Sequence, residues 1–207
     1  MTFAPGRGYS GWMVALRKHL PTRMTVDEFL AWEPGDAACG WQLIDGEPVA
    51  MAPGNQTHGA LQSELGALIR NHLLERRSAC RVLTEPGVVP RVRAGYNYRV
   101  PDLGVTCAPP SLSQMMPEPV LLIELLSPGN EAQTRTNIWA YISIPSVVEI
   151  LAVHTARIEA ELLRRGADGS WPEQPQILGR DAMLTLESIG FSVPLAAAYR
   201  TTVLAVG

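Results

Sequence analysis

The clearest helical pattern in the chain lies in residues 57–77. Apolar side chains recur there at intervals of three and four residues, at Leu61, Leu65, Leu68, Ile69 and Leu73. Because an α-helix has about 3.6 residues per turn, this spacing places the set on one face that can pack against a core. A shorter helix is predicted over residues 25–32, where Thr25 and Glu28 have the spacing of a capping box.

Strand patterns occupy much of the remaining chain. Residues 120–126 read Val-Leu-Leu-Ile-Glu-Leu-Leu, which indicates a central strand covered on both faces. Asp45-Gly46 is a strong hairpin signal between short strands at 41–44 and 48–51. Further strands are predicted at 80–84, 87–92, 98–107, 147–153 and 157–163, a helix at 131–143, and short closing elements at 184–190 and 193–195. This order predicts an α/β (α+β) fold, a mixed β-sheet flanked by helices.

Length and composition limit the class of protein. The chain has 207 residues, which is enough for one globular domain with a sizeable core and cramped for two. We expect a single domain over residues 24–207. Residues 1–23 are either an appendage or the result of a start site assigned too early. No apolar run approaches the roughly 20 residues of a membrane span, and the N-terminus lacks a signal-peptide pattern, so a cytoplasmic protein without membrane contact is expected.

The three cysteines, Cys39, Cys80 and Cys107, are odd in number and widely spaced. They lack the paired spacing of a zinc site or of a disulfide framework. We therefore expect free and mostly buried thiols.

The distribution of charge is more informative than the net charge of −3. Seven arginines lie between Arg70 and Arg99 against two glutamates, whereas all charged side chains from residue 100 to residue 133 are acidic. A basic flank beside an acidic centre suits a phosphate polymer that crosses a metal site, so DNA is the expected partner. A solvated helix end and hairpin would explain the same arginines equally well.

Two acids stand out against this background. Asp102 follows Pro101 near the start of one predicted strand, and Glu124 lies near the end of the next. Burying an isolated carboxylate is costly unless its charge is compensated. If the two strands pair antiparallel, both carboxylates can reach one divalent cation, and Mg²⁺ or Mn²⁺ is the expected cofactor. The alternative is structural, with Asp102 at a strand entry and Glu124 paired with a core arginine.

Five segments occur in an order that is specific as a set: residues 41–47, Pro53 with His58, and residues 100–105, 123–128 and 140–149. Together they resemble the Uma-two family of bacterial restriction-endonuclease-like proteins, within the PD-(D/E)XK nuclease superfamily. The resemblance covers roughly residues 24–154. It implies a restriction-endonuclease-like fold and a metal-dependent DNA endonuclease. A homodimer is also expected, since cutting both strands of DNA often uses two sites.

The resemblance also implies roles for individual residues. Asp102 and Glu124 correspond to metal ligands, with the backbone carbonyl of Leu125 as a third. Glu47, in the predicted hairpin, corresponds to an outer-shell or second-metal position, or else to an ordinary hairpin residue. His58 corresponds to a histidine that opens a helix, for which a catalytic role and a hydrogen-bonded structural role are both open.

The chain departs from the superfamily pattern at the catalytic lysine. Leu126 stands two residues after Glu124, where the superfamily has lysine, and Asn137 stands at the helix position where many Uma-two members have one. Lys18 is the only lysine in the chain. Loss of one preorganised donor typically removes about 3 kcal/mol of transition-state stabilisation. The expected substitutes are Asn137, which could orient a water, and Arg135, which could supply charge.

Two functions therefore compete. The first is an active Mg²⁺-dependent DNA endonuclease, which the pair of acids and the ordered segments favour. The second is a catalytically degenerate protein on the nuclease fold, which binds nucleic acid, metal or a protein partner without efficient cleavage. The missing lysine favours the second function, and fold alone cannot choose between them.

Overall fold

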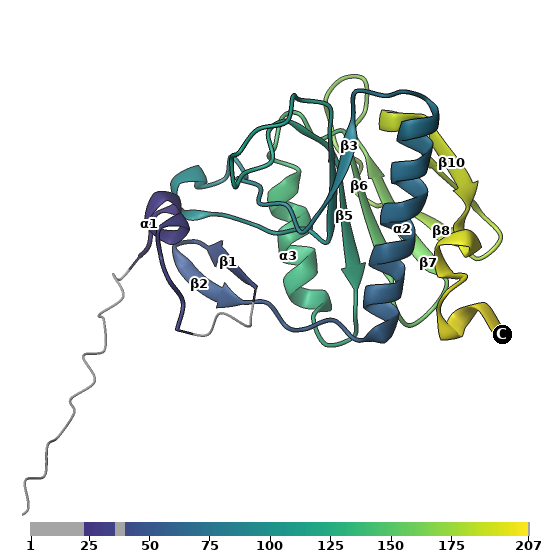
Figure 1. Ribbon diagram of the computed structural model, residues 1–207, viewed down its shortest axis with the longest axis horizontal. Coiled ribbons are helices and arrows are strands. Elements are labelled where there is room, and N and C mark those ends of the chain that lie inside the picture. The colour runs from purple at the N-terminus through teal and green to yellow at the C-terminus, as the bar shows by residue number, and fades with distance from the viewer. Residues whose placement is uncertain (1–22, 36–39, 207) are drawn as a thin grey trace, which may run out of the picture.

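Residues 23–35 and 40–206 are described by the computed structural model, and most of them surround a six-stranded sheet (Figure 1). The strands lie in the order β3 (Arg81–Thr84), β4 (Leu103–Thr106), β5 (Pro119–Leu126), β6 (Glu149–His154), β7 (Glu159–Arg164) and β8 (Gln176–Gly179). Neighbours are antiparallel except β5 and β6, which are parallel and joined through helix α3 (Glu131–Tyr141). The predicted mixed sheet flanked by helices is confirmed.

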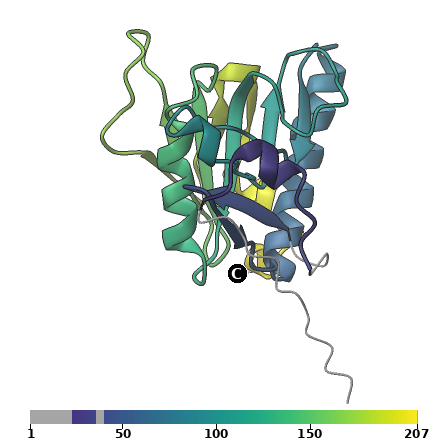
Figure 2. The same ribbon diagram turned by 90° about the vertical axis from the view of Figure 1, so that its left-hand side faces the viewer.

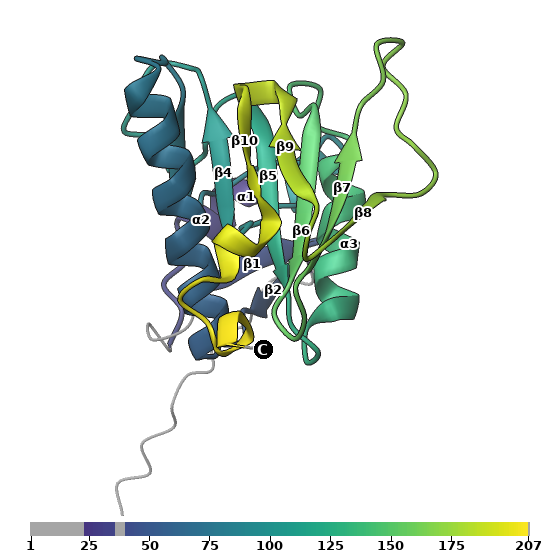
Figure 3. The ribbon, with the colours of Figure 1, turned by 90° about the vertical axis from the view of Figure 1, so that its right-hand side faces the viewer.

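The two faces of β5 are buried under different helices. The odd-numbered residues from Leu121 to Leu125 belong to a core beneath α2 (Gln56–Glu75), whereas Leu122 and Leu126 belong to a core beneath α3. The two helices lie on opposite sides of the sheet (Figures 1 and 3). Because side chains alternate along a strand, Glu124 faces α3. The central strand predicted from the apolar run is therefore confirmed.

Helix α2 carries the apolar face that the spacing of its leucines predicts. Leu61, Leu65 and Ile69 are fully buried. The helix begins after Asn55, whose side chain accepts a hydrogen bond from the backbone N–H of His58 at 2.9 Å. The same face of the sheet is covered by the antiparallel hairpin of β9 (Met183–Leu186) and β10 (Phe191–Pro194), as Figure 3 shows. Short 3₁₀ helices complete this end of the chain: η2 (Glu187–Ile189), η3 (Leu195–Tyr199) and η4 (Val203–Val206).

A smaller core lies to one side of the main sheet (Figure 2). It is formed by α1 (Val26–Leu30), the hairpin of β1 (Trp41–Ile44) and β2 (Glu47–Ala50), and residues that reach across from the main body. The predicted capping box is confirmed, because Thr25 and Glu28 bond each other's backbone N–H groups. The predicted turn is confirmed at Asp45 and Gly46, which have φ values of 51° and 88°.

The strand predicted at 87–92 is wrong, whereas the strand predicted at 98–107 is confirmed only over residues 103–106. Val88 and Arg99 form only an isolated bridge, and β4 begins at Leu103. Pro90 and Pro101 carry no N–H group for a ladder, which explains why regular pairing does not extend through these segments. Between them lies η1 (Ala94–Tyr96). The extended stretch that follows η1 leads directly into the candidate site.

Cys80 and Cys107 form a disulfide. They immediately flank the paired residues Arg81 and Thr106 at the ends of β3 and β4. The expectation of free thiols is therefore wrong for these two. The antiparallel pairing of β3 and β4 brings the cysteines together, whereas their separation of 27 residues in the sequence does not indicate a disulfide. Cys39 lies outside the described residues.

Two other expectations concern the ends and surroundings of the chain. The predicted appendage over residues 1–23 lies outside the described residues, apart from Arg23. Within residues 23–35 and 40–206, none of the helices has the length and apolar character that a membrane crossing requires.

Candidate active site

Asp102 and Glu124 are brought together by the register of β4 and β5. Leu103 pairs with Ile123 in the antiparallel ladder, so the residues one step beyond, Asp102 and Glu124, also stand side by side. Both are buried, with exposed fractions of 7% and 4%. The expected convergence of the two acids is thus what the strand pairing produces.

The Asp102 carboxylate is held from two directions. The backbone N–H of Leu125 donates to Oδ2 at 2.6 Å, and His58 Nε2 lies 2.8 Å from Oδ1. One turn along α2 from His58, the side chain of Gln62 donates to the Asp102 carbonyl at 3.0 Å. His58 and Gln62 lie four residues apart on the same face of α2, so the first turns of this helix hold the start of β4 in place. Asp102 is positioned rigidly at the point where strand and helix meet.

The Glu124 carboxylate is held from α3. The hydroxyl of Tyr141 donates to Oε1 at 2.7 Å, and Nδ2 of Asn137 approaches the same oxygen at 3.4 Å. Burial raises the pKa of Glu124 well above its usual value, the charge of Asp102 raises it further, and the two hydrogen bonds oppose the shift. Burial likewise raises the pKa of Tyr141, to which the charge of Glu124 adds. Two carboxylates in this arrangement cannot both ionise readily without a compensating positive charge.

His58 is the titratable base closest to the acids. Its hydrogen bond to Asp102 raises its pKa, while burial of the ring acts in the opposite direction. Its Nδ1 atom is buried and has no hydrogen-bond partner among the described residues. His58 therefore contacts the acidic pair through Asp102 as well as the core.

The acids open into a cleft of about 620 Å³. Its lining comes from the end of β2, the start of α2, the β4 and β5 acids and α3, and it includes Gln62, Glu85, Gln133 and Asn137. Glu85, which the sequence did not point to, adds a third carboxylate. No lysine or arginine is among the described residues that line the cleft. Within the described residues, no three His, Cys, Asp or Glu side chains gather closely enough to hold a metal ion by themselves.

The sequence profile of the Uma2 (Uma-two) family, described as "Putative restriction endonuclease", matches residues 26–198. The chain belongs to the Uma2 family.

The chain is also similar to two known proteins. An uncharacterized protein of Synechocystis sp. is 30% identical over 183 residues, which cover 86% of this chain and 92% of the relative. The crystal structure of a "putative nuclease" from Anabaena variabilis superposes with a TM-score of 0.69 at 18% identity, covering 85% of this chain and 97% of the other. The second likeness concerns the fold alone.

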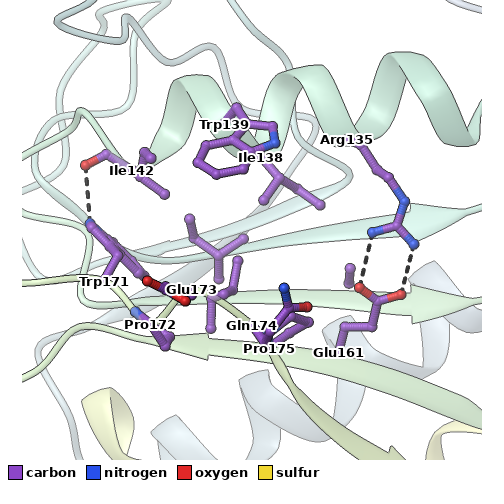
Figure 4. A pocket seen from close by; sticks show the side chains of 13 residues that line it. Arg135, Ile138, Trp139, Ile142, Glu161, Trp171, Pro172, Glu173, Gln174 and Pro175 are labelled. Atoms are coloured by element: carbon purple, nitrogen blue, oxygen red, sulfur yellow. Dashed lines mark hydrogen bonds and ion pairs between the residues drawn. The ribbon is translucent and has the colours of Figure 1, made fainter.

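Two residues that the Uma2 resemblance suggested do not reach the cleft. Glu47 is exposed on β2 and is not part of the cleft lining. Arg135 lies on the far side of α3, where its guanidinium bonds the carboxylates of Glu131 and Glu161 (Figure 4). These bonds, led by the one to Glu161, raise the Arg135 pKa further. Arg135 is therefore not the substitute for the missing lysine.

The register of the sheet explains why the Arg135 side chain points away from the cleft. Glu124 pairs with Ala152 and Ala152 pairs with Glu161, so the two glutamates lie on one sheet face with a small residue between them. Helix α3 runs above this row. The side chain of Asn137 contacts Glu124. The side chain of Arg135 contacts Glu161, beside an apolar pocket lined by Trp139 and Trp171 (Figure 4).

The seven arginines do not form one basic flank beside the acids. Arg70 and Arg76 lie about 18 and 27 Å along α2 from His58, given a rise of about 1.5 Å per residue. Arg81 is bound to the Ala108 and Pro109 carbonyls, and Arg93 is paired with Asp45. None of the seven lines the cleft. The proposed contact between this group and phosphates at the site is not supported by these positions.

The residues that sequence reasoning missed are Glu85, Gln62, Tyr141 and Arg99. Gln62 was accessible in principle, because it lies four residues after His58 on a predicted helix. Tyr141 lies in the predicted helix of residues 131–143, but the helical pattern does not show that its hydroxyl reaches Glu124. Arg99 is 4% exposed and donates to the side chain of Asn137, a contact for which the sequence contains no signal.

Proposed function

We propose that this Uma2 protein is a divalent-metal-dependent endonuclease that hydrolyses phosphodiester bonds in DNA. The observation that carries the proposal is the buried, opposed pair of Asp102 and Glu124 at a cleft that no lysine or arginine of the described chain lines. A structural pair of acids would be expected to bond a buried arginine or lysine directly, whereas the buried Arg99 donates to Asn97 and Asn137 and to neither acid. A mobile cation is the simplest partner for an acid pair that opens to solvent.

The donor set fits Mg²⁺ or Mn²⁺. Hard cations of this size take one or two carboxylates and complete their shell with carbonyl oxygens and waters. Asp102 and Glu124 would provide the carboxylates. The N–H and C=O groups of one strand residue point to the same neighbouring strand, so the carbonyl of Leu125 faces the side on which its N–H contacts Asp102. When bound, the ion would polarise a phosphoryl oxygen and lower the pKa of a coordinated water.

The remaining side chains would orient these groups. Tyr141 and Asn137 both donate to Oε1 of Glu124, which leaves Oε2 free of donors from the described residues. His58 and the Leu125 N–H hold both oxygens of Asp102. Gln133 lines the cleft, and its Nε2 has no partner among the described residues, so it can donate to a phosphate oxygen or a water.

A specific observation also favours the degenerate alternative. Cleavage by this superfamily's mechanism uses a lysine at the metal, and the only lysine, Lys18, lies outside the described residues. Asn137 occupies the predicted lysine position and carries no charge. A protein of this kind would bind metal or nucleic acid at the same two acids without cutting efficiently.

Nicking of a supercoiled plasmid tests the two functions. Wild-type protein with Mg²⁺ or Mn²⁺ should nick the plasmid, and Asp102→Ala and Glu124→Ala should each abolish nicking, whereas Glu47→Ala should retain it as a matched surface control. A rise in melting temperature with Mn²⁺ that Glu124→Ala removes, without nicking, would establish the degenerate alternative. Absence of both effects in folded protein would overturn both functions and would leave a protein-interaction role, to be sought by pull-down.

A further inference from the structure

A buried guanidinium stands directly behind the acidic pair. Arg99 lies in the extended stretch before β4 and is 4% exposed. Its NH1 group donates to Oδ1 of Asn137 at 3.2 Å, and its NH2 group donates to Oδ1 of Asn97 at 2.9 Å. It is not part of the cleft lining, so it contacts the cleft only through the side chains in front of it.

The chemistry of the partners determines how the Asn137 amide is oriented. A guanidinium can only donate hydrogen bonds, and an ionised carboxylate can only accept them. With Arg99 on one side and Glu124 on the other, the amide must present Oδ1 to Arg99 and Nδ2 to Glu124. Without Arg99, only the long 3.4 Å contact with Glu124 would orient the amide.

The same chain of contacts continues to the turn between β1 and β2. Oδ1 of Asn97 accepts from the backbone N–H of Asp45 at 3.0 Å, and Nδ2 of Asn97 donates to the Asp45 carboxylate at 3.1 Å. Arg93 pairs with the other oxygen of that carboxylate at 2.8 Å. In the family-like segment of residues 45–47, Asp45 rather than Glu47 is therefore connected to the site.

We propose that Arg99 is a positioning residue of this site, acting through Asn137 to hold Oε1 of Glu124 so that Oε2 is presented to the metal. We call the path Asp45–Asn97–Arg99–Asn137–Glu124 the Arg99 relay. This inference rests on the proposed metal site. Outer-shell partners of this kind fix the orientation of metal ligands, and their loss typically costs about tenfold to a hundredfold in metal affinity or activity.

The direction of the effect separates positioning from simple electrostatics. Removing a positive charge near a cation site should, by charge alone, tighten cation binding. Weaker Mn²⁺ binding in Arg99→Met would therefore report the loss of orientation rather than the loss of charge. Arg135→Met is the matched control, because it removes an arginine two residues from Asn137 whose guanidinium serves Glu131 and Glu161 instead.

The experiment is a double-mutant cycle on Mn²⁺ affinity, measured by titration calorimetry or electron paramagnetic resonance. Arg99→Met and Asn137→Ala should each weaken binding by about tenfold to a hundredfold. The double variant should be no weaker than the more affected single variant, because both act on one contact. Arg135→Met should bind Mn²⁺ at least as tightly as the wild type. If Arg99→Met does not fold, the same cycle is run with Arg99→Lys, which keeps the charge but loses the guanidinium that donates to two acceptors at once. Arg99→Lys should weaken Mn²⁺ binding less than Arg99→Met. It should not change Mn²⁺ affinity in the Asn137→Ala background.

Each outcome has a defined meaning. Tighter or unchanged Mn²⁺ binding in the folded Arg99 variant, or losses that multiply in the double variant, would overturn the Arg99 relay while leaving the metal site intact. Glu124→Ala tests the site itself. A wild-type protein whose Mn²⁺ binding does not depend on Glu124 would overturn the proposed metal centre, and the relay with it, irrespective of the Arg99 results.

Discussion

The Nε2 atom of His58 lies 2.8 Å from Oδ1 of Asp102, so the first turn of α2 is joined directly to the start of β4. This contact couples a helix terminus to a candidate metal ligand. It also makes the protonation of His58 part of the stability of the site, because the hydrogen bond raises the pKa of the imidazole.

A pH dependence of stability follows from the raised pKa of His58. A base whose pKa is higher in the folded state stabilises the fold below its unfolded-state pKa of about 6.5, and this contribution is lost as the pH rises through the folded-state pKa. In chelator-treated protein, we therefore expect His58→Gln to be less stable than the wild type near pH 6, with a difference that narrows at alkaline pH. Urea unfolding at a series of pH values measures this. A difference that stays constant across the series would contradict it.

Tyr141→Phe should weaken both the fold and the metal site. The Tyr141 hydroxyl is fully buried and donates to Glu124 at 2.7 Å, so its removal leaves a buried carboxylate with one donor fewer. We expect a loss of about 1–3 kcal/mol in the free energy of unfolding and weaker Mn²⁺ binding. The matched control is Tyr199→Phe, whose buried hydroxyl donates to the backbone carbonyls of His154 and Glu159. That variant should lose stability without a change in Mn²⁺ affinity.

Asn137→Lys alone should not rescue activity, although lysine is expected at this position by resemblance. Oδ1 of Asn137 accepts from Arg99, so a lysine ammonium there would face a buried guanidinium. We expect a loss of about 1–3 kcal/mol in stability, because Arg99 loses a hydrogen-bond acceptor and gains a like-charged neighbour that Glu124 only partly offsets.

The double variant Arg99→Met/Asn137→Lys should regain stability, because it moves the single positive charge from behind the site to its edge. It should also nick plasmid faster than the wild type. Melting temperatures and nicking rates of the two single variants and the double variant test both statements. A stable and more active Asn137→Lys single variant would show that Arg99 does not constrain this position.

The cysteines give a simple chemical test of the strand pairing at the sheet edge. The chain has three cysteines, of which Cys80 and Cys107 form a disulfide. Thiol titration of the denatured protein should therefore find one thiol without reductant and three after reduction. Closing a loop of this size stabilises a fold by about 3 kcal/mol on the entropic estimate, so reduction should lower the melting temperature. Three thiols in the unreduced protein would contradict the pairing.

Local patterns were sufficient for several parts of the fold. The leucine spacing of α2, the capping box of Thr25 and Glu28, and the apolar run of β5 all depend on neighbours a few residues apart. The acids were identified for a similar reason, since a carboxylate within an apolar strand is conspicuous in the sequence. The failures at 87–92 and in the first half of 98–107 arose where prolines interrupt a pattern that is otherwise strand-like.

The amino-acid sequence by itself determined that β5 is central, that α2 has one buried face, and that Asp102 and Glu124 are the residues to examine. Only the tertiary structure decided which side of α3 each residue faces, and hence that Arg135 serves Glu161 while Arg99 stands behind Asn137. It also decided that Cys80 meets Cys107. The physical reason is that helix and strand periodicities are set by local backbone geometry, whereas the partner of a buried charge is set by the packing of segments distant along the chain.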